Sequence, residues 1–146
     1  LLRPTNNYGQ RQHSEKLIPL SVKLLTWGKK IRLHNKGEPY RNWLHAEDTA
    51  DAVMTIIDSG EKNQIFNVAG GFEQKNIDTV KKIIKVYFGN NVNWLDYVDL
   101  NHTRPGQDAR YSLNDDKLRS LGWEPKKVFD EEIVEIVNHY KNNFKL

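Results

Sequence analysis

Residues 3–20 read RPTNNYGQRQHSEKLIPL, a polar loop followed directly by an apolar segment. The loop from Thr5 to Gly9 is turn-prone and dense in hydrogen-bonding side chains, as loops that contact ligands often are. The apolar segment continues over residues 15–28, and its apolar positions on most sides predict a buried helix that ends near Gly28. The sequence therefore places a candidate binding loop immediately before a core helix.

The composition is typical of a soluble globular domain. The 146 residues suit one domain, 1–146, with 38% hydrophobic and 28% charged residues. The chain has no cysteine, which excludes disulfides, thiolate catalysis and Cys-based zinc sites. No apolar run approaches the ~20 residues of a membrane span, and the chain does not open on a signal-peptide pattern. We expect a cytoplasmic protein with no membrane partner.

The net charge of +3, from 22 Lys and Arg against 19 Asp and Glu, is mild. Small basic clusters occur, but acidic residues are interspersed among them. This pattern favours ordinary solvated helix faces over a nucleic-acid-binding stripe, so no nucleic-acid partner is expected.

Short apolar strands alternate with amphipathic helices, which predicts a mixed α/β domain with a small sheet. The expected strands are residues 31–34, 40–45, 65–68 and 92–98, and the expected helices are residues 15–28, 47–59, 76–89, 114–122 and 130–144. Within 40–45, Arg41, Trp43 and His45 share one face because side chains alternate along a strand. Asn76 is the expected N-cap of the helix over 76–89.

Two helices have one apolar face by the helical period. In the helix over 47–59 this face carries Ala50, Val53, Met54 and Ile57. In the helix over 76–89 the inward positions are Ile77, Val80, Ile84, Tyr87 and Phe88.

The usual catalytic and cofactor motifs are missing from the sequence. The nine glycines form neither GxGxxG nor a P-loop, and no Tyr is followed four positions later by Lys. The five histidines have no metal-ligand spacing, and no GxSxG elbow is present. We therefore predict no catalytic residue and no metal site in this chain.

Several polar positions are candidates for holding an anion. In HTRPGQDARY, residues 102–111, Arg104 and Arg110 flank a rigid Pro-Gly turn. A guanidinium forks onto two phosphate oxygens, although a surface turn with a rim salt bridge has the same sequence. Arg41 is either exposed on a strand edge or held for an anion, and Lys16 lies where a helix start favours phosphate. Together these signals indicate an anionic ligand held by several loops.

The same segments, read in order, resemble a known family. The carriers are RPTNNYGQRQHSEKLIPL, GEPYRNWLHAEDTADAV, FNVAGG with KNIDTVKKI, RPGQDARYSLNDDKLRSLGWEP and the closing amphipathic helix. They resemble the C-terminal half of extended short-chain dehydrogenase/reductase sugar-nucleotide enzymes, most closely the dTDP-glucose 4,6-dehydratase branch. The NNYG…KLIP block and RPGxDxRY are typical of that branch. Related epimerases and decarboxylases share the Arg-x-Trp/Phe strand and the LGWxP ending more loosely.

The resemblance implies a division of labour. In that family an N-terminal Rossmann half holds NAD and a Tyr-xxx-Lys pair. NAD takes a hydride from sugar C4, water leaves across C5–C6, and the hydride returns to C6. We therefore expect this chain to be a substrate-binding part that is not catalytic alone. Residues 1–10 would be the end of the Rossmann half and the active-site loop, with Leu1 to Pro4 as the tail of a strand of that sheet.

The resemblance also implies individual roles. Asn6 would contact the substrate and Asn7 the cofactor side. Residues expected to bind the dTDP-sugar or a related nucleotide-sugar are Asn6, Lys16, Leu17, Arg32, His34, Arg41, Asn76, Arg104, Gln107 and Tyr111. Among them, Arg41 and Arg104 would clamp the diphosphate, and residues 32–34 would run along the base.

Departures from the family pattern cluster at the base. His34 stands where Tyr is common, Arg32 replaces Pro, and Gln107 replaces His. The base therefore stays open between dTDP and UDP. A part of a UDP-sugar epimerase or decarboxylase, and a non-enzymatic nucleotide-binding module, remain alternatives. Because a part that packs on a Rossmann half exposes apolar surface when isolated, we expect homo-oligomers.

Overall fold

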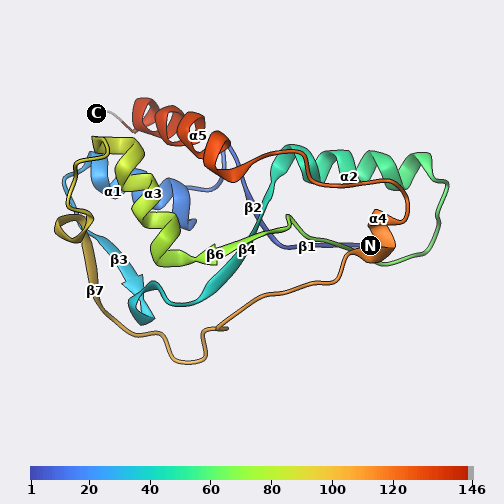
Figure 1. Cartoon of the computed structure of the whole chain (residues 1–146), viewed down its shortest axis with the longest axis horizontal. Helices are drawn as coiled ribbons and strands as arrows, with labels where there is room; N and C mark the ends of the chain where they lie inside the picture. Colours follow the sequence, from blue (N-terminus) through green and yellow to red (C-terminus); the bar gives the residue numbers. More distant parts are fainter. Residues whose placement is uncertain (145–146) are drawn as a thin grey trace.

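The computed structural model describes residues 1–144 (Figure 1). The strands are β1 (Leu2–Pro4), β2 (Asn6–Tyr8), β3 (Ile31–His34), β4 (Tyr40–His45), β5 (Phe66–Val68), β6 (Phe72–Lys75) and β7 (Val98–His102). The helices are α1 (Leu17–Thr26), α2 (Ala46–Asp58), α3 (Asn76–Phe88), α4 (Asp116–Arg119) and α5 (Phe129–Asn143), with 3-10 turns η1 (Asn35–Gly37) and η2 (Trp94–Tyr97). Within this part of the chain, every helix is too short or too polar to span a bilayer.

The strands form three small sheets, which confirms the predicted mixed α/β class. β1 pairs with β5 and β3 pairs with β7, both in parallel. The middle sheet has the order β2-β4-β6, parallel on one side of β4 and antiparallel on the other. The predicted strands 31–34 and 40–45 both exist, but they lie in different sheets.

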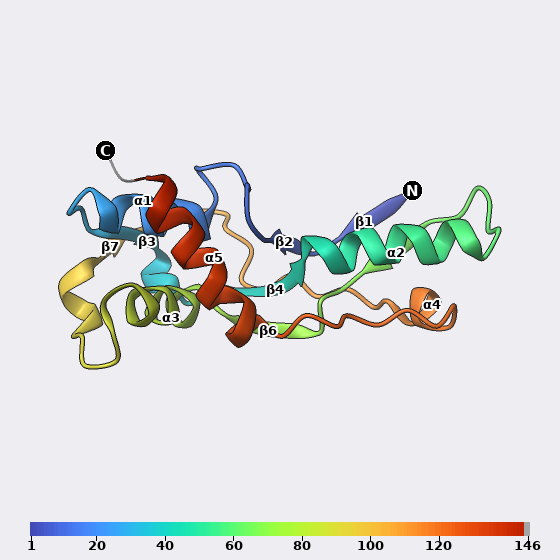
Figure 2. The ribbon, with the colours of Figure 1, turned by 90° about the horizontal axis from the view of Figure 1, so that it is seen from above.

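Helices α1, α3 and α5 gather at one end of the molecule and cover β3 and the near part of the middle sheet (Figures 1 and 2). Their apolar faces meet in the larger core, where Val22, Val80, Ile84 and Val137 are completely buried. The period of three and four in these helices produces that core, as expected.

Helix α2 lies at the opposite end, beside β1, β5 and α4 (Figure 2). A second, smaller core there contains Leu44, Ala52, Phe66, Val68, Leu118 and Trp123. The buried Asp48 carboxylate accepts backbone N–H bonds from Lys126 and Lys127 at 3.0 and 3.1 Å. This contact ties the chain after α4 to the face of α2 that carries Asp48 and Ala52.

The apolar face predicted for the helix over 47–59 is therefore not the buried one. Met54 and Ile57 are 53% and 63% exposed, because the segment around Trp123 covers the Asp48 side of α2 instead. Phe88, predicted to point inward, is 44% exposed at the end of α3.

Two local predictions are also wrong, and one strand was not predicted. Asn76 is the first residue of α3 rather than its N-cap, a position that Lys75 holds without a side-chain capping bond. Within the strand predicted over residues 92–98, Trp94–Tyr97 form the turn η2, and the strand β7 starts only at Val98. The β6 strand was not expected from the sequence, because Phe72–Lys75 has little apolar alternation. By contrast, the strand expected near Leu1 to Pro4 is present as β1, with β5 as its neighbour.

Candidate functional site

A cleft of about 350 Å³ lies where β2, the start of α1, β3, β4, the start of α3 and the Arg104 turn converge. Ten of the eleven binding residues predicted from the sequence line it: Asn6, Asn7, Lys16, Leu17, Arg32, His34, Arg41, Asn76, Arg104 and Gln107. The eleventh, Tyr111, does not line the cleft. Sequence segments up to 100 residues apart thus reach one site, and their binding roles remain predictions.

The two asparagines of the opening loop differ in how they are held. β2 runs parallel to β4, with Asn6 opposite Trp43. The Asn7 amide donates to the Thr5 carbonyl at 3.1 Å and accepts from the Thr49 hydroxyl at 2.6 Å. Asn6 makes no side-chain hydrogen bond within residues 1–144. Asn6 is therefore available to a ligand, whereas Asn7 is already part of the local scaffold.

Two helix starts face the cleft. Lys16 occupies the N-cap position of α1 without a side-chain cap, and no acidic residue lies in the first turn. Asn76 begins α3 and also lines the cleft. Backbone N–H groups at helix starts carry partial positive charge, which favours an anion. The start of α3 already has Asp78 in its first turn, so the start of α1 is the less compensated of the two.

The cleft gathers more positive than negative charge, because four basic residues line it together with one acidic residue, Glu15. Lys16, Arg32, Arg41 and Arg104 all line it, and none of them forms an ion pair within residues 1–144. Some basic residues elsewhere in the described part of the chain, such as Lys82, pair with carboxylates, whereas others, such as Lys85, do not. What distinguishes the cleft is that four unpaired basic side chains line one space. The cleft is thus suited to a ligand that carries more than one negative charge.

Arg104 is held by its backbone rather than by its guanidinium. Its N–H donates to the Asn35 Oδ1 at 3.1 Å, and its carbonyl accepts from the Asn35 Nδ2 at 3.2 Å. The same Nδ2 donates to the Gln107 Oε1 at 2.8 Å. Asn35, in the η1 turn, therefore holds the Pro-Gly turn next to the C-terminal end of β3.

Three buried polar atoms in the cleft lack a partner: Gln12 Oε1, Trp43 Nε1 and Asn76 Oδ1. A buried unsatisfied group costs ~1–3 kcal/mol, so such groups mark places where a ligand or solvent compensates. One is a donor and two are acceptors, a combination that hydroxyl groups complement. The sequence analysis assigned no binding role to Gln12 or Trp43, although Trp43 shares a strand face with Arg41.

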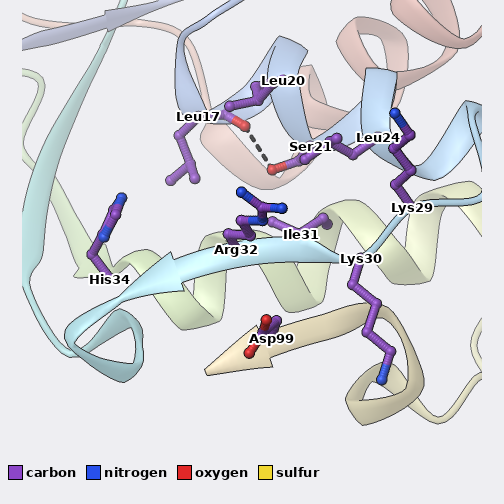
Figure 3. A pocket seen from close by; sticks show the side chains of 10 residues that line it. All are labelled: Leu17, Leu20, Ser21, Leu24, Lys29, Lys30, Ile31, Arg32, His34 and Asp99. Carbon is purple, nitrogen blue, oxygen red and sulfur yellow. Dashed lines mark hydrogen bonds between the residues drawn. The ribbon is translucent and has the colours of Figure 1, made fainter. Parts of the chain in front are cut away.

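A second groove, of about 610 Å³, continues the cleft between α1 and β3 (Figure 3). Both spaces share Leu17, Leu20, Arg32 and His34. In Figure 3, Arg32 rises from β3 toward α1, with His34 at one end of the groove and Lys29 and Lys30 at the other. The leucines give this groove an apolar wall, which suits a flat ring more than a phosphate.

The outer face of β3 and β7 adds polar groups that the sequence analysis did not single out. Asp99 lies opposite Arg32 in the pairing, and its carboxylate contacts the His102 ring at 3.0 Å. A backbone N–H from Asn101 and the His102 contact hold the pKa of Asp99 below its usual range. Within residues 1–144, no group of three or more His, Asp or Glu side chains is arranged to hold a metal ion.

Comparison with known proteins gives the class of fold. Residues 1–69 match the profile of the NAD dependent epimerase/dehydratase family. A crystal structure of dTDP-glucose 4,6-dehydratase from Bacillus anthracis in complex with NAD superposes with a TM-score of 0.85 and 33% identity, over 97% of this chain and 44% of that one. UDP-glucose 4-epimerase from Thermotoga maritima gives a TM-score of 0.79 at 21% identity, a likeness of fold alone. The chain has the fold of one part of the extended short-chain dehydrogenase/reductase enzymes, as predicted.

Sequence relatives narrow the comparison. The chain is 35% identical to dTDP-D-glucose 4,6-dehydratase of Mus musculus, over 99% of this chain and 41% of that protein. The dTDP-glucose 4,6-dehydratase 1 of Escherichia coli is 34% identical to this chain, over 97% of this chain and 40% of that protein. The chain thus spans about two fifths of the length of the curated relatives it matches.

Proposed function

We propose that this chain is the nucleotide-sugar-binding portion of an NAD-dependent enzyme that resembles dTDP-glucose 4,6-dehydratase. The observation that carries the proposal is the cleft itself, in which unpaired cations and two helix starts surround buried polar atoms without partners. A nucleoside diphosphate sugar offers what this cleft complements: a charged diphosphate, hydroxyl groups and a flat base.

The parts of the substrate are assigned by chemistry. Arg41 and Arg104 hold the diphosphate, because both guanidinia lack a carboxylate partner. The base enters the groove beside Leu17 and His34, where apolar side chains provide a wall. The sugar extends toward Asn6, next to the unsatisfied indole N–H of Trp43.

NAD supplies the hydride acceptor and donor of the proposed reaction. Of the residues in this chain, Asn7 is the one assigned to the cofactor side. Its amide is bonded to Thr5 and Thr49, which leaves one N–H and one lone pair for a further contact. A single amide does not hold a dinucleotide, so the proposal assigns NAD binding and acid-base catalysis to a partner Rossmann half.

The face around α2 supports such a partner. β1 and β5 make a two-stranded parallel sheet of three residues each, and parallel sheets are normally covered on both faces. Beside it, Leu1, Leu2, Val53, Ile56, Ile57 and Phe66 line an open groove of about 280 Å³ together with polar residues. Apolar side chains and an incomplete parallel sheet fit the edge of a larger sheet of the same kind.

The direct test is calorimetric titration of the chain with dTDP, dTDP-glucose and UDP, compared with Arg41→Ala and Arg104→Ala. We expect dTDP to bind the native chain and both substitutions to weaken it. If none of the three ligands binds at millimolar concentration, autonomous binding by this chain is wrong.

A reconstitution extends the test to catalysis. The chain is mixed with a separately expressed Rossmann half of a dTDP-glucose 4,6-dehydratase, and conversion of dTDP-glucose is followed in the presence of NAD. We expect conversion only when both parts are present. Sequencing upstream of the codon for Leu1 gives an independent check, because a GxxGxxG motif and a Tyr-xxx-Lys pair in frame would support the enzyme over a non-enzymatic module.

A further inference from the structure

The segment from Asp108 to Tyr111 follows the Arg104 turn and runs extended from β7 toward α4 (Figure 1). Its backbone lies against the start of β4. The Asp108 carbonyl accepts from Arg41 Nη1 at 3.1 Å, and the Ala109 carbonyl accepts from the Tyr40 N–H at 2.8 Å. Arg110 also forms a parallel bridge with Tyr40. The segment is therefore hydrogen-bonded to β4, the strand that carries Arg41.

The Arg110 side chain fastens this segment to a second strand. Its Nε and Nη2 donate to the two carboxylate oxygens of Glu73 on β6, at 2.6 and 2.8 Å. The pair raises the pKa of Arg110 and lowers the pKa of Glu73 through the hydrogen bonds between them. A two-point fork fixes both distance and angle, unlike a single contact. Arg110, one of two arginines that flank the turn, thus makes the rim salt bridge that the sequence left open.

Tyr111 lies against Arg41 itself. Its ring centroid is 5.0 Å from the Arg41 guanidinium carbon, within the range of a cation–π contact. Arg41 Nη1 also donates to the Tyr40 carbonyl at 2.6 Å. The Arg41 guanidinium is held by two carbonyls and an aromatic ring, while its Nε and Nη2 have no partner within residues 1–144. These two nitrogens are the ones left to meet a ligand.

We propose that Arg110, Glu73 and Tyr111 form a positioning latch that sets the orientation of the Arg41 guanidinium and its spacing from Arg104. Arg104 belongs to the same loop and is anchored separately at Asn35. The latch ties that loop to β4 and β6, so it fixes the position of Arg41 relative to the Arg104 turn. The effect on ligand binding rests on the proposed function, whereas the ordering of Arg41 does not.

The first test uses the unliganded chain. Order parameters of the Arg41 Nε–Hε group are measured by ¹⁵N relaxation in the native chain, in Arg110→Gln, in Glu73→Gln and in Tyr111→Leu. We expect a clear loss of order in all three variants. Lys126→Gln is the matched control, because Lys126 forms an exposed ion pair with Asp51 at 3.0 Å that is remote from Arg41. Unchanged order in the three latch variants would overturn the proposal.

The second test measures dTDP affinity and thermal unfolding of the same variants. We expect affinity to fall about tenfold in Arg110→Gln and Glu73→Gln, as for the loss of a charge-assisted contact, with little change in Tm. The exchanged pair, Glu73→Arg with Arg110→Glu, should recover part of the affinity, which a general loss of stability would not allow. Arg110→Lys, which keeps the charge but not the fork, should lie between native and Arg110→Gln.

The two tests separate the latch from the proposed function. If the native chain does not bind dTDP but Arg41 loses order in the variants, the latch stands and the assigned ligand is wrong. If dTDP binds the native chain and the variants equally well, the latch is wrong and the binding function stands.

Discussion

The two ends of this molecule differ in the size of their hydrophobic cores. Among residues 1–144, seventeen buried side chains form one continuous core at the end with α1, α3 and α5, and the cleft opens beside it. At the end with α2, six buried side chains form the core, and Leu1, Met54, Ile57 and Ile65 are exposed. Both ends expose large apolar side chains, since Trp27, Phe88 and Val134 are exposed at the first end. The second end differs in its smaller core and in its two-stranded parallel sheet, beside which an open groove with apolar lining lies.

The two ends therefore suit two different roles, ligand binding and docking onto a partner. A cleft that binds a charged ligand needs arginines held within a fraction of an ångström, and a well-packed scaffold provides that. An end that docks onto another sheet needs an apolar face and a free strand edge, which leave it weak when isolated. The difference in packing therefore supports the proposal that the chain works with a larger partner.

The largest expected effect contrasts one residue type at both ends. Ile84 is fully buried in the larger core, whereas Ile57 is 63% exposed on α2. We expect Ile84→Ala to lower the free energy of unfolding by about 2–5 kcal/mol, because it leaves a cavity in a packed core. Ile57→Ala should change it by less than about 0.5 kcal/mol. Urea unfolding followed by circular dichroism measures both, and equal losses would contradict the two-end description.

The next effect concerns charge in the cleft. We expect Arg41→Ala and Arg104→Ala each to weaken dTDP binding by about 10- to 100-fold, because each removes a charge-assisted contact. The control is Arg3→Ala, which removes the same charge from β1 at the other end. Titration calorimetry should show near-native affinity for that variant. A similar loss in all three would mean that binding responds to net charge rather than to the cleft.

The sequence anticipated the cleft better than it anticipated the α2 end. Asn6, Arg41 and Arg104 were predicted as binding residues from the sequence, and the structure places all three on the lining of one cleft. The exposed apolar face of α2 has the same helical period as the face of a core helix. Periodicity alone therefore does not show whether such a face is buried in the core of the chain or against a partner. The contacts of Asp48 with Trp123, Lys126 and Lys127 decide which face of α2 is buried.

Two further features of the structure depend on pairings between segments that are remote in sequence. Tyr111 carries the family motif, but backbone pairing at Tyr40 places its ring on Arg41 rather than in the cleft. The separation of β3 and β4 into different sheets depends on partners at Val98 and Asn6, which are remote in sequence. Such long-range pairings carry no local signal.

A smaller effect concerns self-association through the α2 face. We expect the isolated chain to associate as concentration rises, and Met54→Ser with Ile57→Ser to shift it toward monomer. Val134→Ser is the control, because Val134 is also exposed but lies on α5 at the other end of the molecule. Light scattering across a concentration series measures the mass. A monomeric native chain at all concentrations would count against the α2 face as a docking surface.

The smallest expected effect is a pH dependence that distinguishes two similar ion pairs. Arg110 holds the pKa of Glu73 below its usual range at the cleft, and Lys127 does the same for Glu47 on α2. A lowered folded pKa adds stability above the unfolded value of about 4.3 and loses it as pH falls through the folded pKa. Both Glu73→Gln and Glu47→Gln should therefore flatten the fall of Tm below that pH, and only slightly, since exposed pairs contribute little.

Protonating Glu73 also opens the latch, so the order of the Arg41 Nε–Hε group should fall over the same acid range in the native chain and in Glu47→Gln. In Glu73→Gln it should be low already at pH 6 and stay constant, because the group that titrates is gone. If the order parameter of the Arg41 Nε–Hε group does not change with pH in the native chain, the Arg41 side chain is held in place without Glu73.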